Sequence, residues 1–261
     1  MERKLGLLVC AVALTVCGVA GAAPKVKAAA KKPSGPVAWC GEGTTTLPNG
    51  LCHIDGGQPA DGRRTLVVFL HGAIAKDVDW QWLQERALTR QAKASKFEAV
   101  FARAPLMPGG YLWPGSKEAQ EQHEQALIDG WNEARAYLEK KNGKYDEVFL
   151  MGFSSGAYFT SSLVLRGRAR FDGYAVFAGG AGVAYAAAEE PAPKAPVYVG
   201  VCTEDKQTAN HSRAFGGALA ARGFVHRVDE QKVGHMFSDI HMLHALSWLR
   251  AQQPKKSPDP T

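Results

Sequence analysis

The sequence predicts an α/β protein in which a mainly parallel sheet is covered by helices on both faces. Short, continuously apolar runs alternate with longer stretches of helical spacing along most of the 261 residues. Continuous apolar runs are typical of strands that are buried on both faces of a parallel sheet. Strands that alternate with helices form right-handed crossovers, which place helices on both sides of the sheet. With 46% hydrophobic and 21% charged residues, a chain of this length is expected to form one large globular domain.

The expected elements can be read in order along the chain. Apolar runs predict strands at residues 66–70, 97–101, 147–151, 174–178, 197–202 and 225–228. Apolar residues three and four apart predict helices at residues 80–95, 117–141, 155–166, 209–222 and 238–250. The core-facing side is predicted to include Leu83 and Leu88 in the first helix, and Ala126 and Trp131 in the second. In such sheets, active sites form at the carboxyl ends of the strands.

Both ends of the chain are predicted to lie outside the folded domain. Residues 1–22 have the features of a secretory signal peptide: a net positive start, an apolar run and the small-residue cleavage site Ala20-Gly21-Ala22. We therefore expect an exported protein, periplasmic or secreted, without stable membrane insertion after signal removal. A lipoprotein acylated at Cys17 is an alternative, although Val16 is bulkier than the residue usual there. Residues 23–36 predict a flexible linker, residues 37–253 the folded domain and residues 254–261 a polar tail.

Cys40, Cys52 and Cys202 remain after removal of the signal peptide, and two of them are close in sequence at the start of the folded domain. Cys40 and Cys52 flank the tight-turn signal Asn49-Gly50, and a hairpin there would bring the two cysteines together. In an oxidising compartment this spacing allows a Cys40–Cys52 disulfide, and the sequence leaves its formation open. Cys202 lies in an apolar run and is expected to be a buried free thiol.

One short motif points to a nucleophile. Gly152-Phe153-Ser154-Ser155-Gly156 is a G-x-S-x-G pattern that lies directly after a predicted strand and directly before a predicted helix. A strand-to-helix turn of this kind is so tight that its neighbours must be small, which explains both glycines. The turn raises the Ser154 hydroxyl above the sheet edge and aims backbone N–H groups of the helix at a reacting carbonyl. We therefore expect Ser154 to be the nucleophile.

A serine hydroxyl needs a base, and the base needs a carboxylate to fix its tautomer. His235 follows the last predicted strand on a short loop, and Asp205 follows the strand at residues 197–202. Both positions are at the carboxyl edge, so Ser154, Asp205 and His235 are predicted to converge there as a catalytic triad. The chain order, nucleophile then acid then histidine, matches the order usual for this kind of site.

Other residues compete for these roles. Glu204 is adjacent to Asp205 and could replace it, and Asp229 is a third choice because it is close to His235 in sequence. His71 is the rival histidine, but it follows the first long strand, where orientation of the local backbone is the expected role. The oxyanion formed on attack needs backbone donors, for which we predict the N–H groups of Ala73 and Ser155.

These motifs together resemble a known family. The chain combines Leu70-His71-Gly72-Ala73, the segment 103–108 followed by Trp113, the Ser154 motif, Asp205 and Gly234-His235. The arrangement resembles the phospholipase/carboxylesterase branch of the α/β-hydrolases over about residues 64–250. The resemblance implies an α/β-hydrolase fold, ester cleavage of small molecules and a place for Trp113 near the acyl pocket; a core or rim role for Trp113 is equally consistent. Secreted polyester depolymerases and feruloyl esterases share similar motifs and are close competitors.

Other classes of function have less support. His241 and His244, three apart on a predicted helix, lack a second group of ligands at metal-like spacing, so no metal is expected. The run Gly179-Gly180-Ala181-Gly182 lacks the full dinucleotide fingerprint, and no cofactor is expected. No nucleic-acid motif accompanies the net charge of +6, much of which comes from basic tails. A non-catalytic binding protein on the same fold remains the alternative of a different class, since fold does not fix function. The sequence gives no indication of oligomeric state.

Overall fold

A computed structural model describes residues 38–180 and 194–254 of the chain. The predicted signal peptide and linker, nearly all of the predicted tail, and Ala181-Gly182 of the glycine-rich run lie outside these residues. In the described part of the chain, no helix is long and apolar enough to cross a membrane.

The central element is an eight-stranded sheet formed by the described residues. Its order is β1-β2-β4-β3-β7-β8-β9-β10, and every pair from β4 to β10 is parallel. The antiparallel pairs are β1 with β2 and β2 with β4, which confirms the predicted mainly parallel sheet with an N-terminal hairpin. The strands are β1 (Thr45–Thr46), β2 (Cys52–Asp55), β3 (Thr65–Leu70), β4 (Glu98–Phe101), β7 (Glu147–Phe153), β8 (Gly173–Phe177), β9 (Val197–Cys202) and β10 (His226–Gln231).

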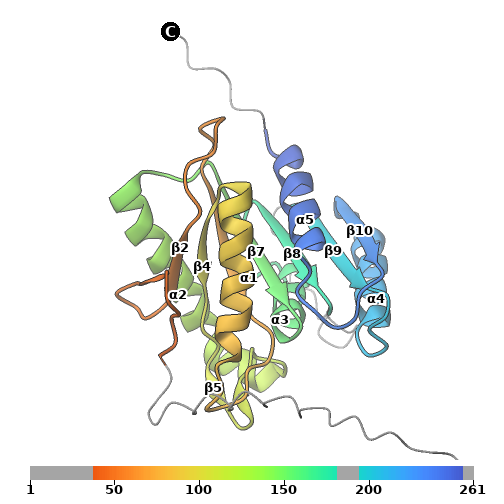
Figure 1. The fold of residues 1–261 in the computed structure, drawn as a ribbon. Helices are drawn as coiled ribbons and strands as arrows, with labels where there is room; N and C mark the ends of the chain where they lie inside the picture. The colour runs from red at the N-terminus through yellow and green to blue at the C-terminus, as the bar shows by residue number, and fades with distance from the viewer. Residues whose placement is uncertain (1–37, 181–193, 255–261) are drawn as a thin grey trace, which may run out of the picture. The chain divides into compact units, whose positions relative to one another are not determined.

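In the described residues, five helices cover the two faces of this sheet. They are α1 (Trp80–Ser95), α2 (Lys117–Asn142), α3 (Ser155–Leu165), α4 (Ala209–Ala221) and α5 (Asp239–Gln252). Side chains of α1 and α5 pack into one apolar core and those of α2, α3 and α4 into the other. In Figure 1, α1 and α5 accordingly lie side by side in front of the strands. The helix boundaries agree with the predicted ones to within two residues.

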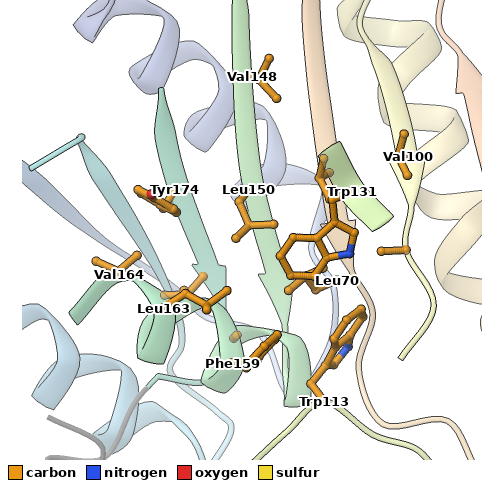
Figure 2. Close-up of a cluster of buried hydrophobic side chains, with 14 of the residues drawn as sticks. Leu70, Val100, Trp113, Trp131, Val148, Leu150, Phe159, Leu163, Val164 and Tyr174 are labelled. Carbon is orange, nitrogen blue, oxygen red and sulfur yellow. The ribbon is translucent and has the colours of Figure 1, made fainter. Parts of the chain in front are cut away.

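Alternate residues of the buried strands supply the two cores. Leu66, Val68 and Leu70 of β3 belong to one, and Val67 and Phe69 belong to the other. This is the period of two expected of a pleated strand, and here both phases are apolar because helices cover both faces. Figure 2 shows part of the core that packs on α2 and α3, where the Trp131 ring lies beside Leu70 and Leu150, and Phe159 lies beside Trp113.

The faces of the first two helices agree with the prediction in part, because Leu88 and Trp131 are buried as predicted but Leu83 and Ala126 are exposed. In α1 the buried side chains are Gln81, Glu85, Leu88, Gln91 and Ala92, whereas Leu83 is 58% exposed. In α2 the buried side includes Glu124, Ile128 and Trp131, whereas Ala126 is exposed. The prediction counted apolar residues only, whereas Gln81, Glu85 and Glu124 are buried with specific hydrogen-bond partners. Glu85, for example, accepts a hydrogen bond from the Gly41 N–H.

The start of the domain is tied to the sheet by a disulfide. Cys40 and Cys52 are bonded, with their Cα atoms 5.4 Å apart, which decides the pairing that the sequence left open. The hairpin between β1 and β2 turns at Asn49-Gly50, where Gly50 has a positive φ of 81° that favours glycine. Cys202 is a buried free thiol, as predicted.

A second, small hairpin was not predicted. It pairs β5 (Leu106–Met107) with β6 (Gly110–Tyr111), in the segment between β4 and α2. Gly110 has a φ of 133°, and a Cβ there would lie 2.2 Å from the Ile74 carbonyl oxygen. The hairpin therefore packs directly against the segment that follows β3, at the carboxyl edge of the sheet.

Candidate active site

The turn between β7 and α3 holds Ser154 in a strained conformation. Its φ of 50° and ψ of −115° fall in a region that residues with a side chain rarely adopt. A Cβ at Gly152 would lie 2.3 Å from the Gly156 carbonyl oxygen, and one at Gly156 would lie 2.2 Å from the Leu70 carbonyl oxygen. Both glycines of the motif are therefore required by close backbone approach. The turn leaves Ser154 at the carboxyl end of the strand and at the start of a helix.

Two distant loops bring a histidine and an aspartate to this serine. His235 lies between β10 and α5, and its Nε2 is 2.9 Å from the Ser154 Oγ. Asp205 follows β9, and its Oδ2 is 2.6 Å from the His235 Nδ1. The His235 side chain is 42% exposed and that of Asp205 only 4%. A substrate can thus reach the imidazole, whereas the carboxylate is shielded from water.

The local hydrogen bonds of Asp205 keep it ionised. Burial raises the pKa of this carboxyl, but hydrogen bonds from the Thr208 hydroxyl, from His235 and from the backbone N–H groups of Gln207 and Thr208 lower it further, to about 2. The two backbone N–H groups donate to Oδ1, at 3.0 and 3.3 Å, which leaves Oδ2 for His235 and the Thr208 hydroxyl. Because the carboxylate accepts a hydrogen bond from Nδ1, the imidazole carries its proton on Nδ1. Its Nε2 is then free to accept a hydrogen bond from the Ser154 hydroxyl.

The competing carboxylates are placed elsewhere. Glu204 is exposed, and its N–H donates to the Val233 carbonyl, so its backbone braces the histidine loop while Asp205 contacts the ring. Asp229 lies inside β10 and accepts from the Tyr198 hydroxyl, from Gln231 and at 2.7 Å from His244. His241 is buried and directs its Nε2 at the Asp229 carbonyl. Asp229, His241 and His244 thus form a separate cluster between β10 and α5.

His71, the rival histidine, directly follows β3 and is fully buried. Burial lowers the pKa of its imidazole to about 4, so the ring is neutral near neutral pH. Its Nδ1 pairs with the Gly72 carbonyl, and its Nε2 accepts from the Ala104 N–H at 3.2 Å. Because Nε2 accepts, the ring proton is on Nδ1, where it is donated to Gly72. His71 therefore fixes the backbone of the turn after β3.

That turn lies against the nucleophile. A Cβ at Gly72 would be 2.9 Å from the Phe153 ring and 3.3 Å from the Ser154 Cβ, so the turn packs closely on the serine. The Gly72 carbonyl points at the His71 ring, and in a trans peptide the N–H of Ala73 points the opposite way. The Ser155 N–H is the first of α3, and neither it nor the Ala73 N–H donates a hydrogen bond among the residues described. Both predicted oxyanion donors are therefore unengaged at the edge where Ser154 lies.

Trp113 lies at the base of a cavity beside the serine. The cavity has a volume of about 490 Å³ and is lined by Trp113, Pro114, Gly115, Gln120, Ser154, Ser155, Tyr158, Phe159 and His211. Trp113 is 3% exposed, and its ring stacks on Phe159 with centroids 5.9 Å apart. Its indole N–H donates to the His71 carbonyl at 2.8 Å, and its backbone N–H donates to the Ser155 Oγ. Trp113 thus serves both the core and the cavity wall, the two places that the sequence left open.

Sequence reasoning missed several residues that support this site. Gln84 of α1 accepts the Gly72 N–H at 2.7 Å, and Tyr158 and His211 pair across the cavity. No sequence signal marks these contacts, because each joins elements whose approach depends on the fold. Thr208 could have been found, since an aspartate followed by a threonine three residues later is a common local hydrogen-bonding motif.

The arrangement is suited to nucleophilic catalysis. It supplies a hydroxyl in contact with an imidazole, an ionised carboxylate behind that imidazole and two backbone donors at the same edge of the sheet. Within residues 38–180 and 194–254, no group of three or more His, Cys, Asp or Glu side chains is placed to hold a metal ion.

Comparison with known proteins agrees with this fold. A model of the dienelactone hydrolase family matches residues 115–241, a segment that runs from just before α2 into α5 and contains Ser154, Asp205 and His235. No curated protein matches the chain.

Solved structures match over most of the chain at low identity. A carboxylesterase from Mesorhizobium loti is 16% identical with a TM-score of 0.56, covering 80% of this chain and 99% of its own. A carboxylesterase from Bacillus cereus is 15% identical with a TM-score of 0.56, covering 77% of this chain and 94% of its own. SOBER1 from Arabidopsis thaliana is 20% identical with a TM-score of 0.52, covering 72% and 98%. At these identities the likeness establishes the α/β-hydrolase fold.

Proposed function

We propose that this chain, an α/β-hydrolase by fold, cleaves carboxylic esters of small molecules through an acyl-enzyme on Ser154. The observation that carries the proposal is the continuous hydrogen-bonded chain from the Ser154 hydroxyl through His235 to Asp205. The match to the dienelactone hydrolase family and the esterase names of the structural neighbours support an ester as the substrate.

The first half of the reaction forms the acyl-enzyme. The Ser154 Oγ attacks the ester carbonyl carbon while its proton moves to the His235 Nε2. The negative charge that develops on the carbonyl oxygen is stabilised by the N–H groups of Ala73 and Ser155. The tetrahedral intermediate then collapses, and the imidazolium of His235, stabilised by Asp205, gives its proton to the departing alkoxide oxygen.

The second half uses water and the same residues. With the alcohol gone, the His235 Nε2 accepts a proton from a water molecule, whose oxygen attacks the acyl carbon. The carboxylic acid is released and the Ser154 hydroxyl is restored. The exposed position of the His235 ring is suited to this step because water can reach Nε2 from solvent.

Export is part of the same proposal. The Cys40–Cys52 disulfide favours an oxidising compartment, since such bonds are rare in reducing ones. A secreted or periplasmic enzyme would meet its esters outside the cytoplasm. Isolating the mature protein from culture fluid or periplasm and determining its N-terminal residue tests this directly; an intact Met1 on a cytoplasmic protein would reject export.

A fluorophosphonate probe tests the nucleophile. We expect the wild-type protein to be labelled at a stoichiometry of one, with the adduct on the tryptic peptide that carries Ser154. A burst of p-nitrophenol from p-nitrophenyl acetate should report the acyl-enzyme. Ser154→Ala should neither label nor turn over the ester, and its thermal unfolding should remain close to wild type because the hydroxyl is at the protein surface.

A matched control separates loss of chemistry from loss of structure. Ser95→Ala changes a serine at the end of α1, at the opposite edge of the sheet, and should label like wild type. Folded wild-type protein that neither labels nor hydrolyses any ester would reject the enzyme and favour a binding protein on this fold.

A further inference from the structure

The cavity beside Ser154 lies on one side of the triad only. Its lining includes Ser154 and Ser155 but neither His235 nor Asp205. It is bounded by the start of α3, by the segment from Trp113 to Gln120 and by the start of α4, whereas the His235 ring contacts Phe153, which is outside the lining. The serine is therefore flanked by the cavity on one side and the imidazole on the other.

This placement decides which half of an ester the cavity can hold. In ester cleavage the protonated histidine gives its proton to the leaving alcohol oxygen, so this oxygen must lie beside the imidazole. The alcohol therefore departs on the His235 side, and the acyl group extends away from it. The cavity is the space available in that direction.

We propose that this cavity is the acyl-binding site and that the Tyr158–His211 pair in its wall selects uncharged acyl groups that carry a hydrogen-bond donor at the far end. The inference rests on the proposed function, because it assigns a substrate class to the same nucleophile.

The walls of the cavity suit an apolar acyl chain. The stacked rings of Trp113 and Phe159 and the ring of Pro114 are apolar parts of its lining. The lining residues that the structure describes include no Asp, Glu, Lys or Arg side chain, so no ion pair is offered to a charged acyl group. Moving a carboxylate from water into such a site without a partner is strongly unfavourable.

The polar end of the cavity is the Tyr158–His211 pair. The Tyr158 Oη is 2.6 Å from the His211 Nδ1, and the two residues come from α3 and α4. Burial and the nearby charge of Asp205 raise the pKa of the Tyr158 phenol, which keeps the proton on the phenol at neutral pH. In this proposal the phenol is the donor to the His211 Nδ1, which leaves the lone pairs of the phenol oxygen for the cavity. A hydroxyl group on the substrate can donate to this oxygen, whereas a carboxylate is repelled by it.

The pair is within reach of a short acyl chain. The Tyr158 N–H donates to the Ser154 carbonyl, so Tyr158 is one helical turn, about 5.4 Å of rise, beyond the nucleophile. Ser154, Tyr158 and His211 also line the same cavity. Acyl groups of about six carbons, which extend over about one helical turn, are therefore suitable probes.

The experiment compares three p-nitrophenyl esters of equal acyl length: hexanoate, ω-hydroxyhexanoate and the monoester of adipate. We expect wild-type kcat/KM to be highest for the hydroxyl acyl group, by about two- to tenfold over hexanoate, the range that one hydrogen bond supplies. Adipate should be poorest. Tyr158→Phe should abolish the advantage of the hydroxyl group, so that the ratio of kcat/KM for ω-hydroxyhexanoate to that for hexanoate falls to about one.

Two further variants sharpen the result. His211→Ala removes the acceptor of the phenol proton, so the Tyr158 hydroxyl can donate to a substrate carboxylate. We therefore expect kcat/KM for the adipate ester to rise relative to that for hexanoate, whereas Tyr158→Phe should remove the preference for the hydroxyl group. Tyr137→Phe, which changes an exposed tyrosine of α2, is the matched control and should reproduce wild type. Thermal unfolding of each variant shows that it is folded.

A second series keeps the hexanoyl group and varies the alcohol. If Tyr158→Phe changes discrimination among alcohols and not among acyl groups, the cavity binds the leaving group and the inference is wrong. Equal kcat/KM for the three acyl groups in wild type would also overturn it. Both outcomes leave p-nitrophenyl acetate hydrolysis by Ser154 intact, whereas loss of that activity in wild type would instead reject the proposed function.

Discussion

Replacing Asp205 with asparagine is the sharpest test of how the site works. Oδ1 of Asp205 accepts two backbone N–H groups, from Gln207 and Thr208. An asparagine must keep its carbonyl oxygen there, because an amide NH2 group in that place would lose both bonds. The amide nitrogen therefore takes the position of Oδ2, which faces the Nδ1 of His235.

This exchange reverses the tautomer of the imidazole. An amide nitrogen donates only, so the His235 Nδ1 must become an acceptor and its proton must move to Nε2. Nε2 can then no longer accept the proton of Ser154, and the negative charge that stabilised the imidazolium is gone as well. The same substitution in a serine-protease triad lowers kcat about 10⁴-fold, and we expect a loss of about this size here, about 5 kcal/mol in the barrier.

The stability of the variant is expected to fall much less than its activity. The carboxyl pKa of about 2, against 3.8 in a free side chain, corresponds to about 2 kcal/mol of stabilisation at neutral pH. A loss of this size leaves a domain with ordinary stability folded. The assay is kcat/KM for p-nitrophenyl acetate and the labelling rate with a fluorophosphonate, each measured beside thermal unfolding.

Two matched variants make the test specific. Asp229→Asn changes the other aspartate that pairs with a histidine, and Glu204→Gln changes the neighbouring carboxylate. Both should keep wild-type activity. A folded Asp205→Asn enzyme with less than a tenfold loss, about 1.4 kcal/mol, would refute the tautomer argument, as would a comparable loss in Asp229→Asn.

Three further perturbations have expected outcomes. Gly156→Ala should lose activity and about 1–3 kcal/mol of unfolding free energy together, because its Cβ would meet the Leu70 carbonyl. Urea titration measures the unfolding free energy, and a variant that is both stable and active would contradict the required close approach. Reducing the Cys40–Cys52 disulfide, which closes a short loop, should lower the unfolding free energy by about 3 kcal/mol in denaturant titrations with and without reductant, and no change would contradict this. At Glu98, burial raises the carboxyl pKa, but bonds from His53, Arg64 and Tyr145 lower it further, to about 2. This stabilisation is present above the unfolded pKa and is lost as pH falls through the folded one, so Glu98→Gln should flatten the loss of stability between about pH 4.5 and 2 and leave ester turnover intact.

Residues that the sequence could place are those whose constraints are local. Gly152, Ser154 and Gly156 lie within five positions of one another, and the strand before and helix after them are visible as apolar patterns. His235 and Asp205 could be placed because each follows a recognisable strand, and parallel strands bring their carboxyl ends to one edge. Their contact with Ser154 follows from topology, even though they are 81 and 51 positions away in the chain.

Residues that the sequence could not place depend on which elements meet. The polar side of α1 is buried because the segment around the disulfide packs on it: Gln81 donates to the Ala38 carbonyl and Glu85 accepts from Gly41. A count of apolar residues assigns such positions to solvent. It therefore predicts an exposed Glu85 and a buried Leu83, the reverse of what the structure shows. The Tyr158–His211 pair was invisible for the same reason, since it joins two helices across a cavity.

The two edges of the sheet therefore differ in kind. At the amino edge, Glu98 and Glu147 are buried, and each is held by arginine side chains that neutralise it. At the carboxyl edge, Ser154 and Ala178 have positive φ at the ends of neighbouring strands, and the N–H groups of Ala73 and Ser155 donate no hydrogen bond among the described residues. Strain and unpaired donors cost stability, by about 1–3 kcal/mol for each strained residue, and persist only where the surroundings are rigid enough to impose them. The paired amino edge and the two cores provide that rigidity, which explains why a reactive arrangement can be kept at the opposite edge.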